Sequence, residues 1–354
     1  MKKYISYLFP ILLLVLVMSC ENQEKVFPDY KYTSVYFPYQ YSVRTLILGD
    51  DELTNTENDN KLLFKIGVTL GGLYKNTQNR NVEYVIDETL TDGLYTPEGI
   101  KILALPRQYY NLPLSGTIVI PNGAMQGYLD VQLNESFLDD PFADTVKYVI
   151  PLKIISAQAD TVLRGKSDLL APDPRIGDNW SLLPKDFTIY GIKYINPYHG
   201  TYLYRGKDIY TKGTTIDTMI YTNKFVEKTE IAYLNTYSKN QVNFTTMLRR
   251  VGGSPGNLSM ILTFDESGNC AITSNANSKA VVTGTGKFVK EGDNWGGKNR
   301  NVIHLTYNFT DVANNETHTV ADTLVIRDRN VKLETYIPVV KYEKQNYAIK
   351  MLRL

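Results

Sequence analysis

Residues 302–309 read VIHLTYNF, and this stretch decides the fold class. Apolar side chains occupy every second position, at Ile303, Leu305, Tyr307 and Phe309. Alternation of this kind puts one set of side chains on each face of a β-strand, whereas a helix repeats about every 3.6 residues. The same alternation recurs from about residue 32 onward, and no convincing helical period interrupts it. The sequence therefore predicts an all-β protein.

Turn signals divide the chain into two blocks. Residues 32–165 contain short strands separated by turns, a pattern typical of an immunoglobulin-like β-sandwich. Residues 166–186 are rich in proline, which cannot donate to a β-ladder, so we predict a linker there. Residues 187–354 contain longer strands, the last over 347–352, and predict an antiparallel β-barrel because closure removes exposed edges. A second sandwich is the competing layout.

Length and charge narrow the function classes. A chain of 354 residues suggests about two domains. Lys and Arg total 38 against 37 Asp and Glu, a net charge of +1. This balance gives little attraction to a phosphate backbone, so we expect no nucleic-acid partner. The 27 tyrosines suit strands and binding faces, because each ring combines an apolar face with a polar tip.

The first residues have the form of a lipoprotein leader. Residues 1–19 combine two lysines, an apolar run and a small residue before Cys20, as a secretory signal peptide does. The sequence VMSC at 17–20 resembles a bacterial lipobox, which implies that Cys20 carries acyl chains such as palmitate. Residues 20–31 would then be a tether. The alternative is an ordinary cleaved signal that happens to lie near a cysteine.

Three stretches together resemble a known group of proteins. They are the leader, YVIPLKI at 148–154 and NPYHGTY at 196–202. The chain resembles the two-domain surface lipoproteins of Sus-like polysaccharide-utilisation loci in Bacteroidetes. The resemblance implies an immunoglobulin-like N-terminal domain, a lipocalin-like or sandwich C-terminal domain, and glycan binding at the cell surface. The acidic residues just after Cys20 resemble a surface-export signal, so we expect an outer-membrane lipoprotein that faces outward.

Catalytic and metal-binding patterns are missing from the sequence. No paired-carboxylate glycosidase motif and no G-x-S-x-G nucleophile turn occurs. The three histidines lack the tight spacing of a zinc site. We therefore predict a protein that is not an enzyme and needs neither a cofactor nor a metal, while calcium binding by acidic loops stays open.

Two tryptophans are the candidate binding residues. Trp295 lies in EGDNWGGKNR (291–300), which reads as a polar, Gly-rich loop between two strands. A sugar ring can lie on an indole while Asp293, Asn294 and Arg300 bind its hydroxyl groups. The alternative is that the loop folds back and Trp295 plugs one end of the barrel. Trp180, in the linker, either wedges between the two domains or contributes to ligand binding.

Three functions remain open at this stage. The first is a non-catalytic, outer-membrane glycan-binding lipoprotein that captures an oligosaccharide or polysaccharide for a Sus-like importer. The second is a structural or adhesive surface lipoprotein that binds a partner protein through an exposed strand edge. The third is a lipocalin-like carrier of a small hydrophobic ligand, which would need an open apolar cavity in the second block.

Overall fold

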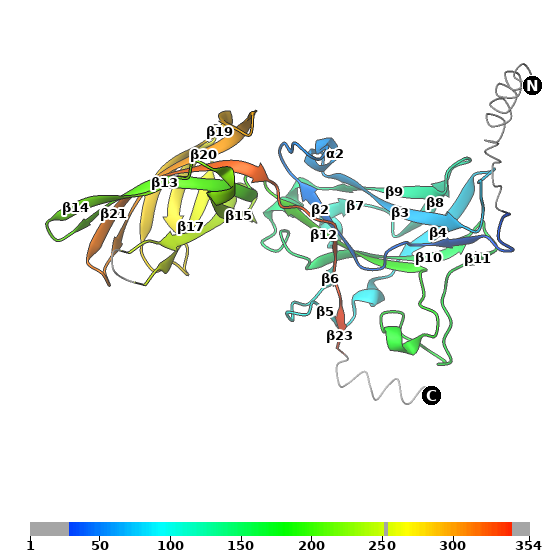
Figure 1. Ribbon diagram of the computed structural model, residues 1–354. Coiled ribbons are helices and arrows are strands. Elements are labelled where there is room, and N and C mark those ends of the chain that lie inside the picture. Colours follow the sequence, from blue (N-terminus) through cyan, green and yellow to red (C-terminus); the bar gives the residue numbers. More distant parts are fainter. Residues whose placement is uncertain (1–27, 251–253, 342–354) are drawn as a thin grey trace, which may run out of the picture.

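The computed structural model describes residues 28–250 and 254–341. The predicted leader, Cys20, most of the tether and the strand predicted over 347–352 lie outside these ranges. Strands account for 53% of the structure and helices for 7%, so the all-β prediction is confirmed. Figure 1 shows two lobes, with the barrel formed by β13 to β21 on one side and the N-terminal sheets on the other.

The N-terminal lobe is a sandwich-like pair of sheets, as predicted. One sheet contains β1 (Ser34–Tyr36), β3 (Leu63–Gly71), β7 (Tyr110–Asn111), β9 (Gln126–Leu133) and β11 (Thr161–Val162). The other contains β2 (Ser42–Ile47), β4 (Arg80–Ile86), β6 (Leu103–Ala104), β8 (Ser115–Ile120), β10 (Tyr148–Ala157), β12 (Phe187–Ile195) and β22 (Glu334–Thr335). Alternate residues of the strands, such as Ile66 and Val68 of β3 and Leu152 of β10, form the core between the sheets.

Helical segments are short and lie in the connections. They are α2 (Glu57–Asn60), η1 (Glu88–Thr91), η2 (Arg107–Tyr109), η3 (Glu135–Asp139), η4 (Gly177–Asn179) and η5 (Val226–Lys228). None of the helices in the described ranges has the length and apolar character that crossing a membrane requires.

The boundary between the lobes differs from the predicted one. We expected residues 187–195 to begin the barrel, but β12 pairs with β10 and β2 of the sandwich. Residues 166–186 are therefore not an interdomain linker but a loop of the sandwich, closed by the bridge between Lys166 and Leu182. Proline marks a loop correctly, but its presence does not determine which sheet the following strand joins.

The C-terminal lobe is a closed antiparallel barrel of eight strands, so the barrel was the correct alternative. Its strands are β13 (Gly200–Lys212), β15 (Glu230–Ser238), β16 (Gln241–Leu248), β17 (Gly256–Phe264), β18 (Asn269–Ser274), β19 (Val282–Trp295), β20 (Lys298–Asp311) and β21 (Glu316–Asp328). Pairing of β13 with β21 closes the barrel, and β14 (Thr215–Tyr221) lies beside the second half of β13.

The barrel interior is filled by side chains. Tyr202, Phe244, Leu262 and Leu305 are among the residues of its buried core. A Cβ added at Gly284 of β19 would lie 2.6 Å from the Cβ of Tyr307, so glycine is needed where these strands approach closely. The described barrel interior is therefore packed with Tyr, Phe and Leu side chains, whereas the third function above predicts an open apolar cavity there.

Arg329 fixes the two lobes against each other. Its side chain is buried and donates to four carbonyl oxygens: Leu48 at 3.0 Å, Asp50 at 2.9 Å, Asn196 at 2.7 Å and His199 at 2.8 Å. After Arg329 the chain returns to the sandwich, where β22 pairs with β2 and β23 (Val339–Val340) pairs with β5 (Leu94–Tyr95) (Figure 1). The predicted barrel domain therefore ends before β22 rather than at residue 354.

Candidate functional site

Trp295 stands at the end of a long hairpin rather than in an irregular loop. Strand β19 continues to Trp295, which pairs with Lys298 of β20 across Gly296 and Gly297. The two glycines have φ of +62° and +77°, as a two-residue turn of type I′ requires. The prediction of a polar, Gly-rich loop over 291–300 was wrong, because the strand pairing continues through these residues up to a two-residue turn at Gly296 and Gly297.

The indole of Trp295 covers the outside of the barrel wall. It packs against Leu203, Val302 and Val325, which point away from the barrel interior, and it remains partly exposed. Trp295 therefore does not plug a barrel end, and it does not project freely from a loop tip. It forms a half-buried aromatic surface held by three strands.

Charged groups surround this indole. The Arg205 guanidinium carbon lies 5.9 Å from the centre of the indole ring, and Arg205 also forms an ion pair with Asp293. Arg300 donates to the Trp295 carbonyl at 3.3 Å and lies 3.8 Å from a carboxylate oxygen of Glu52 in the sandwich. The predicted residues Trp295, Asp293 and Arg300 are thus brought together.

Asn294 belongs to the same hairpin and donates to Asn299 at 3.1 Å. Arg205 and Glu52 were not predicted, because they come from β13 and from the sandwich and no local pattern links them to Trp295. We use the name Trp295 surface for Trp295, Arg205, Asp293, Asn294, Arg300 and Glu52.

Trp180 does not belong to the Trp295 surface. Its indole N–H donates to the Asp173 carbonyl at 2.8 Å, and its ring lies against Gly165. All of these residues lie in or beside the 166–186 loop of the sandwich, away from the barrel (Figure 1). The interpretation of Trp180 as an interdomain wedge was wrong, because the loop folds onto its own lobe. A contribution of Trp180 to ligand binding stays a prediction, at a place apart from the Trp295 surface.

A polar cluster inside the barrel was not predicted. Asp322 accepts hydrogen bonds from Tyr204 at 2.9 Å and Tyr307 at 2.8 Å, and Tyr221 donates to its other oxygen. Burial raises the pKa of Asp322 to about 6, although hydrogen bonds from the three tyrosines act in the opposite direction. No sequence signal links these residues, which lie on four different strands.

A second buried cluster surrounds His318. Its Nδ1 lies 2.8 Å from Asp208 and its Nε2 lies 3.5 Å from Glu316, while its ring stacks on Phe309 at 4.3 Å. Within the described ranges, no group of three or more His, Cys, Asp or Glu side chains has an arrangement that could hold a metal ion. His318, Asp208 and Glu316 are all buried and form part of the packing of the barrel.

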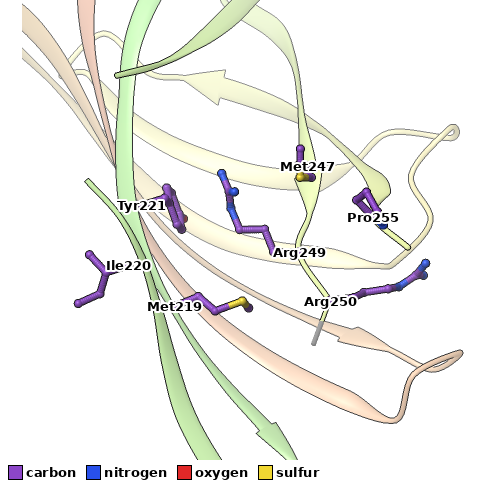
Figure 2. A pocket seen from close by; sticks show the side chains of 7 residues that line it. All are labelled: Met219, Ile220, Tyr221, Met247, Arg249, Arg250 and Pro255. Carbon is purple, nitrogen blue, oxygen red and sulfur yellow. The ribbon is translucent and has the colours of Figure 1, made fainter. Parts of the chain in front are cut away.

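A hollow of about 340 Å³ opens in the barrel wall (Figure 2). It is lined by Met219, Ile220 and Tyr221 of β14, by Met247, and by Arg249, Arg250 and Pro255. It lies between β14 and the end of β16, whereas the indole of Trp295 covers β13, β20 and β21.

Comparison with known proteins places the chain in a family. Residues 197–330 match the model of a domain of unknown function, DUF5627, and residues 30–161 match a family model for an N-terminal domain. A solved structure of a Bacteroides ovatus protein of unknown function is 35% identical, with a TM-score of 0.81, and the match covers 89% of this chain and 100% of that one. The chain belongs to the same family as this Bacteroides ovatus protein.

Other likenesses are weaker. A multidomain protein including DUF1735 from Bacteroides ovatus is 15% identical over 83% of this chain and 94% of that one, with a TM-score of 0.35. An auxiliary nutrient binding protein from Bacteroides thetaiotaomicron is 12% identical over 80% of this chain and 90% of that one, with a TM-score of 0.32. Neither score supports an argument about function. The search of curated proteins found no match.

Proposed function

We propose that the protein is a non-catalytic, lipid-anchored envelope protein that binds an oligosaccharide or polysaccharide at the Trp295 surface. The observation that carries this proposal is a partly exposed indole held on rigid strands and surrounded by charged and amide side chains. A sugar ring presents a C–H face to an aromatic ring, and its hydroxyl groups bind carboxylates, amides and guanidinium groups. The Trp295 surface supplies each of these partners.

The construction of the Trp295 surface favours binding. A binding site gains affinity when its groups are held in place before the ligand arrives, because less conformational entropy is then lost. Trp295 is held by Leu203, Val302 and Val325, and Asp293 is held by Arg205. Glu52 extends the same surface onto the sandwich, and ligand sites are common where two domains meet.

The anchor is part of the same proposal. The lipobox sequence ending at Cys20 supports diacylation, and an acylated Cys20 would hold the protein on the outer membrane, facing outward. A captured glycan would then lie close to an importer of the same membrane. Replacing Cys20 with Ser should abolish incorporation of labelled palmitate and release the protein from the membrane fraction. Unchanged labelling would contradict the anchor but not the glycan site.

Affinity gel electrophoresis of residues 21–354 against a panel of plant and host glycans tests the binding site. We expect at least one glycan to retard the protein, Trp295→Ala to remove the retardation and Trp295→Phe to keep part of it. Trp180→Phe is the matched control, because it changes the other indole in a different lobe. Retardation that survives in Trp295→Ala, or no retardation of the folded protein by any glycan, would overturn the proposal.

A protein-binding role is the second candidate, and the edge strand β14 favours it. Among the described strands, β14 pairs with β13 alone, and its Ile216 and Ile220 are 72% and 74% exposed. Exposed edges with apolar side chains can accept another strand. If this role holds, Ile216→Lys should abolish capture of a surface partner by the anchored protein and leave glycan retardation unchanged. Capture that persists in this variant would exclude β14 as the contact.

A further inference from the structure

The hollow of Figure 2 lies where neighbouring strands of the barrel wall stop pairing with each other. Residues 200–204 of β13 pair with β15, whereas residues from Gly206 onward pair with β14. Pairing of β15 with β16 begins only at Leu234 and Phe244. The later part of β16, up to Leu248, therefore pairs with β17 alone, and a wedge opens between it and β14.

Arg249 bridges this wedge. Its Nη2 donates to Glu230 of β15 at 2.6 Å, and its guanidinium carbon lies 4.0 Å from the centre of the Tyr221 ring. Figure 2 shows Arg249 between Tyr221 and Met247. Within residues 28–250 and 254–341, no partner other than Glu230 accepts a hydrogen bond from the Arg249 side chain. The described residues thus engage Nη2 of Arg249 and leave its Nε and Nη1 for a ligand.

The neighbouring Arg250 differs, because its donors are occupied. Nε and Nη2 both bind Asp311, and Nη1 donates to the Ser254 carbonyl at 3.0 Å. Arg250 therefore closes one side of the hollow as a structural residue, and Arg249 is the group available for an anion.

The rest of the hollow is apolar and its base is rigid. The Tyr221 hydroxyl donates to buried Asp322, which fixes the ring that forms the base. Met247 is about half exposed, at 51%, and Met219 and Pro255 line the same hollow. Methionine adapts to ligands of irregular shape, and apolar surface left open in a concave site indicates a binding role.

We propose that this hollow binds a small organic carboxylate with a short apolar body. The carboxylate accepts from Arg249, partly in place of Glu230, and the apolar body lies against Met219, Met247 and the Tyr221 ring. A volume of about 340 Å³ suits a ligand of this size, since small-molecule sites begin at about 300 Å³. A guanidinium group matches the geometry of a carboxylate, and hydrogen bonds between charged groups are the strong ones. This proposal concerns a different surface from Trp295 and stands independently of glycan binding.

Isothermal titration calorimetry of residues 21–354 tests the proposal with three probes. Octanoate supplies both a carboxylate and an apolar body, octanol lacks the charge, and glucuronate lacks the apolar body. We expect octanoate to bind most tightly. Arg249→Gln should weaken octanoate binding about tenfold or more and leave octanol binding unchanged, because the variant loses the charged hydrogen-bond donors that the carboxylate accepts from.

Glu230→Gln provides the opposite test. This change removes the carboxylate that competes for Arg249, so octanoate should bind about threefold or more tightly. Arg327→Gln, an exposed arginine on β21, is the control and should bind like the unchanged protein. The proposal is overturned if octanol or glucuronate binds as well as octanoate, if Glu230→Gln weakens octanoate binding, or if no probe binds.

Discussion

Replacing Arg329 with Met tests the structural basis of the two-lobed arrangement. Methionine keeps much of the side-chain length and removes every donor. The change leaves four carbonyl oxygens, two from the sandwich and two from the chain that enters the barrel, without their shared guanidinium group. We expect the protein to be destabilised and the lobes to move more freely relative to each other.

The loss of stability expected for Arg329→Met follows from how deeply each of the four hydrogen bonds is buried. The bonds to Leu48 and Asn196 are buried, so their carbonyl oxygens would lose a partner that water cannot replace. The bonds to Asp50 and His199 are partly buried, and water can substitute there. An unsatisfied buried polar group lowers the free energy of unfolding by about 1–3 kcal/mol. Two such groups, together with the smaller losses at Asp50 and His199, give a total of about 3–5 kcal/mol.

Chemical denaturation and small-angle X-ray scattering measure the two consequences. The matched control is Arg327→Met, because the Arg327 side chain is 47% exposed and, within the part of the chain that the structure describes, its ion pair is with the adjacent Asp328 at 2.8 Å. A surface pair of this kind should change the free energy of unfolding by less than about 1 kcal/mol. Equal losses in the two variants, or an Arg329→Met protein with unchanged stability and radius of gyration, would refute the reasoning.

Three further predictions concern the barrel. The folded pKa of Asp322, about 6, lies above the usual value, so its contribution to stability is complete below about pH 4 and is lost as the pH rises through 6. Asp322→Asn should therefore remove a decline of about 3 kcal/mol between pH 4 and 7, measured by thermal unfolding; an unchanged pH profile would contradict the assignment. His318→Leu leaves Asp208 and Glu316 buried without the ring between them and should cost about 3–5 kcal/mol in urea denaturation, whereas a cost below 1 kcal/mol would show that the cluster is not coupled. Gly286→Val places a Cβ 2.6 Å from a carbonyl oxygen of β20 and should destabilise the barrel by about 1–3 kcal/mol, and a neutral result would mean that β19 can move.

The hairpin around Trp295 shows how far sequence reasoning reached. The residue types and their spacing identified Trp295, Asp293, Asn294 and Arg300 as one group, and the structure keeps them on one hairpin. The same reasoning could not show that Leu203, Val302 and Val325 lie beneath the indole or that Arg205 pairs with Asp293. These partners come from strands far away along the chain.

Strand β12 was correctly placed in a strand-rich block from its sequence but was assigned to the wrong lobe. Its alternation identified residues 187–195 as part of a strand-rich block, yet its partners are β10 and β2 of the sandwich. Proline-rich residues before it suggested a domain boundary that does not exist. The division of the barrel wall beside β14 also had no sequence signal, because it depends on where the pairing of β15 with β16 begins.

The sequence by itself determined the β class, the approximate division into two blocks, the leader pattern at Cys20 and the candidate aromatic hairpin. These follow from local rules, because side-chain alternation and turn residues act over a few positions. Only the tertiary structure decided which strands pair, how Arg329 joins the lobes and where the barrel wall opens. Those features depend on contacts between residues distant in sequence, and the choice of strand partner is set by the packing of whole faces rather than by any single stretch.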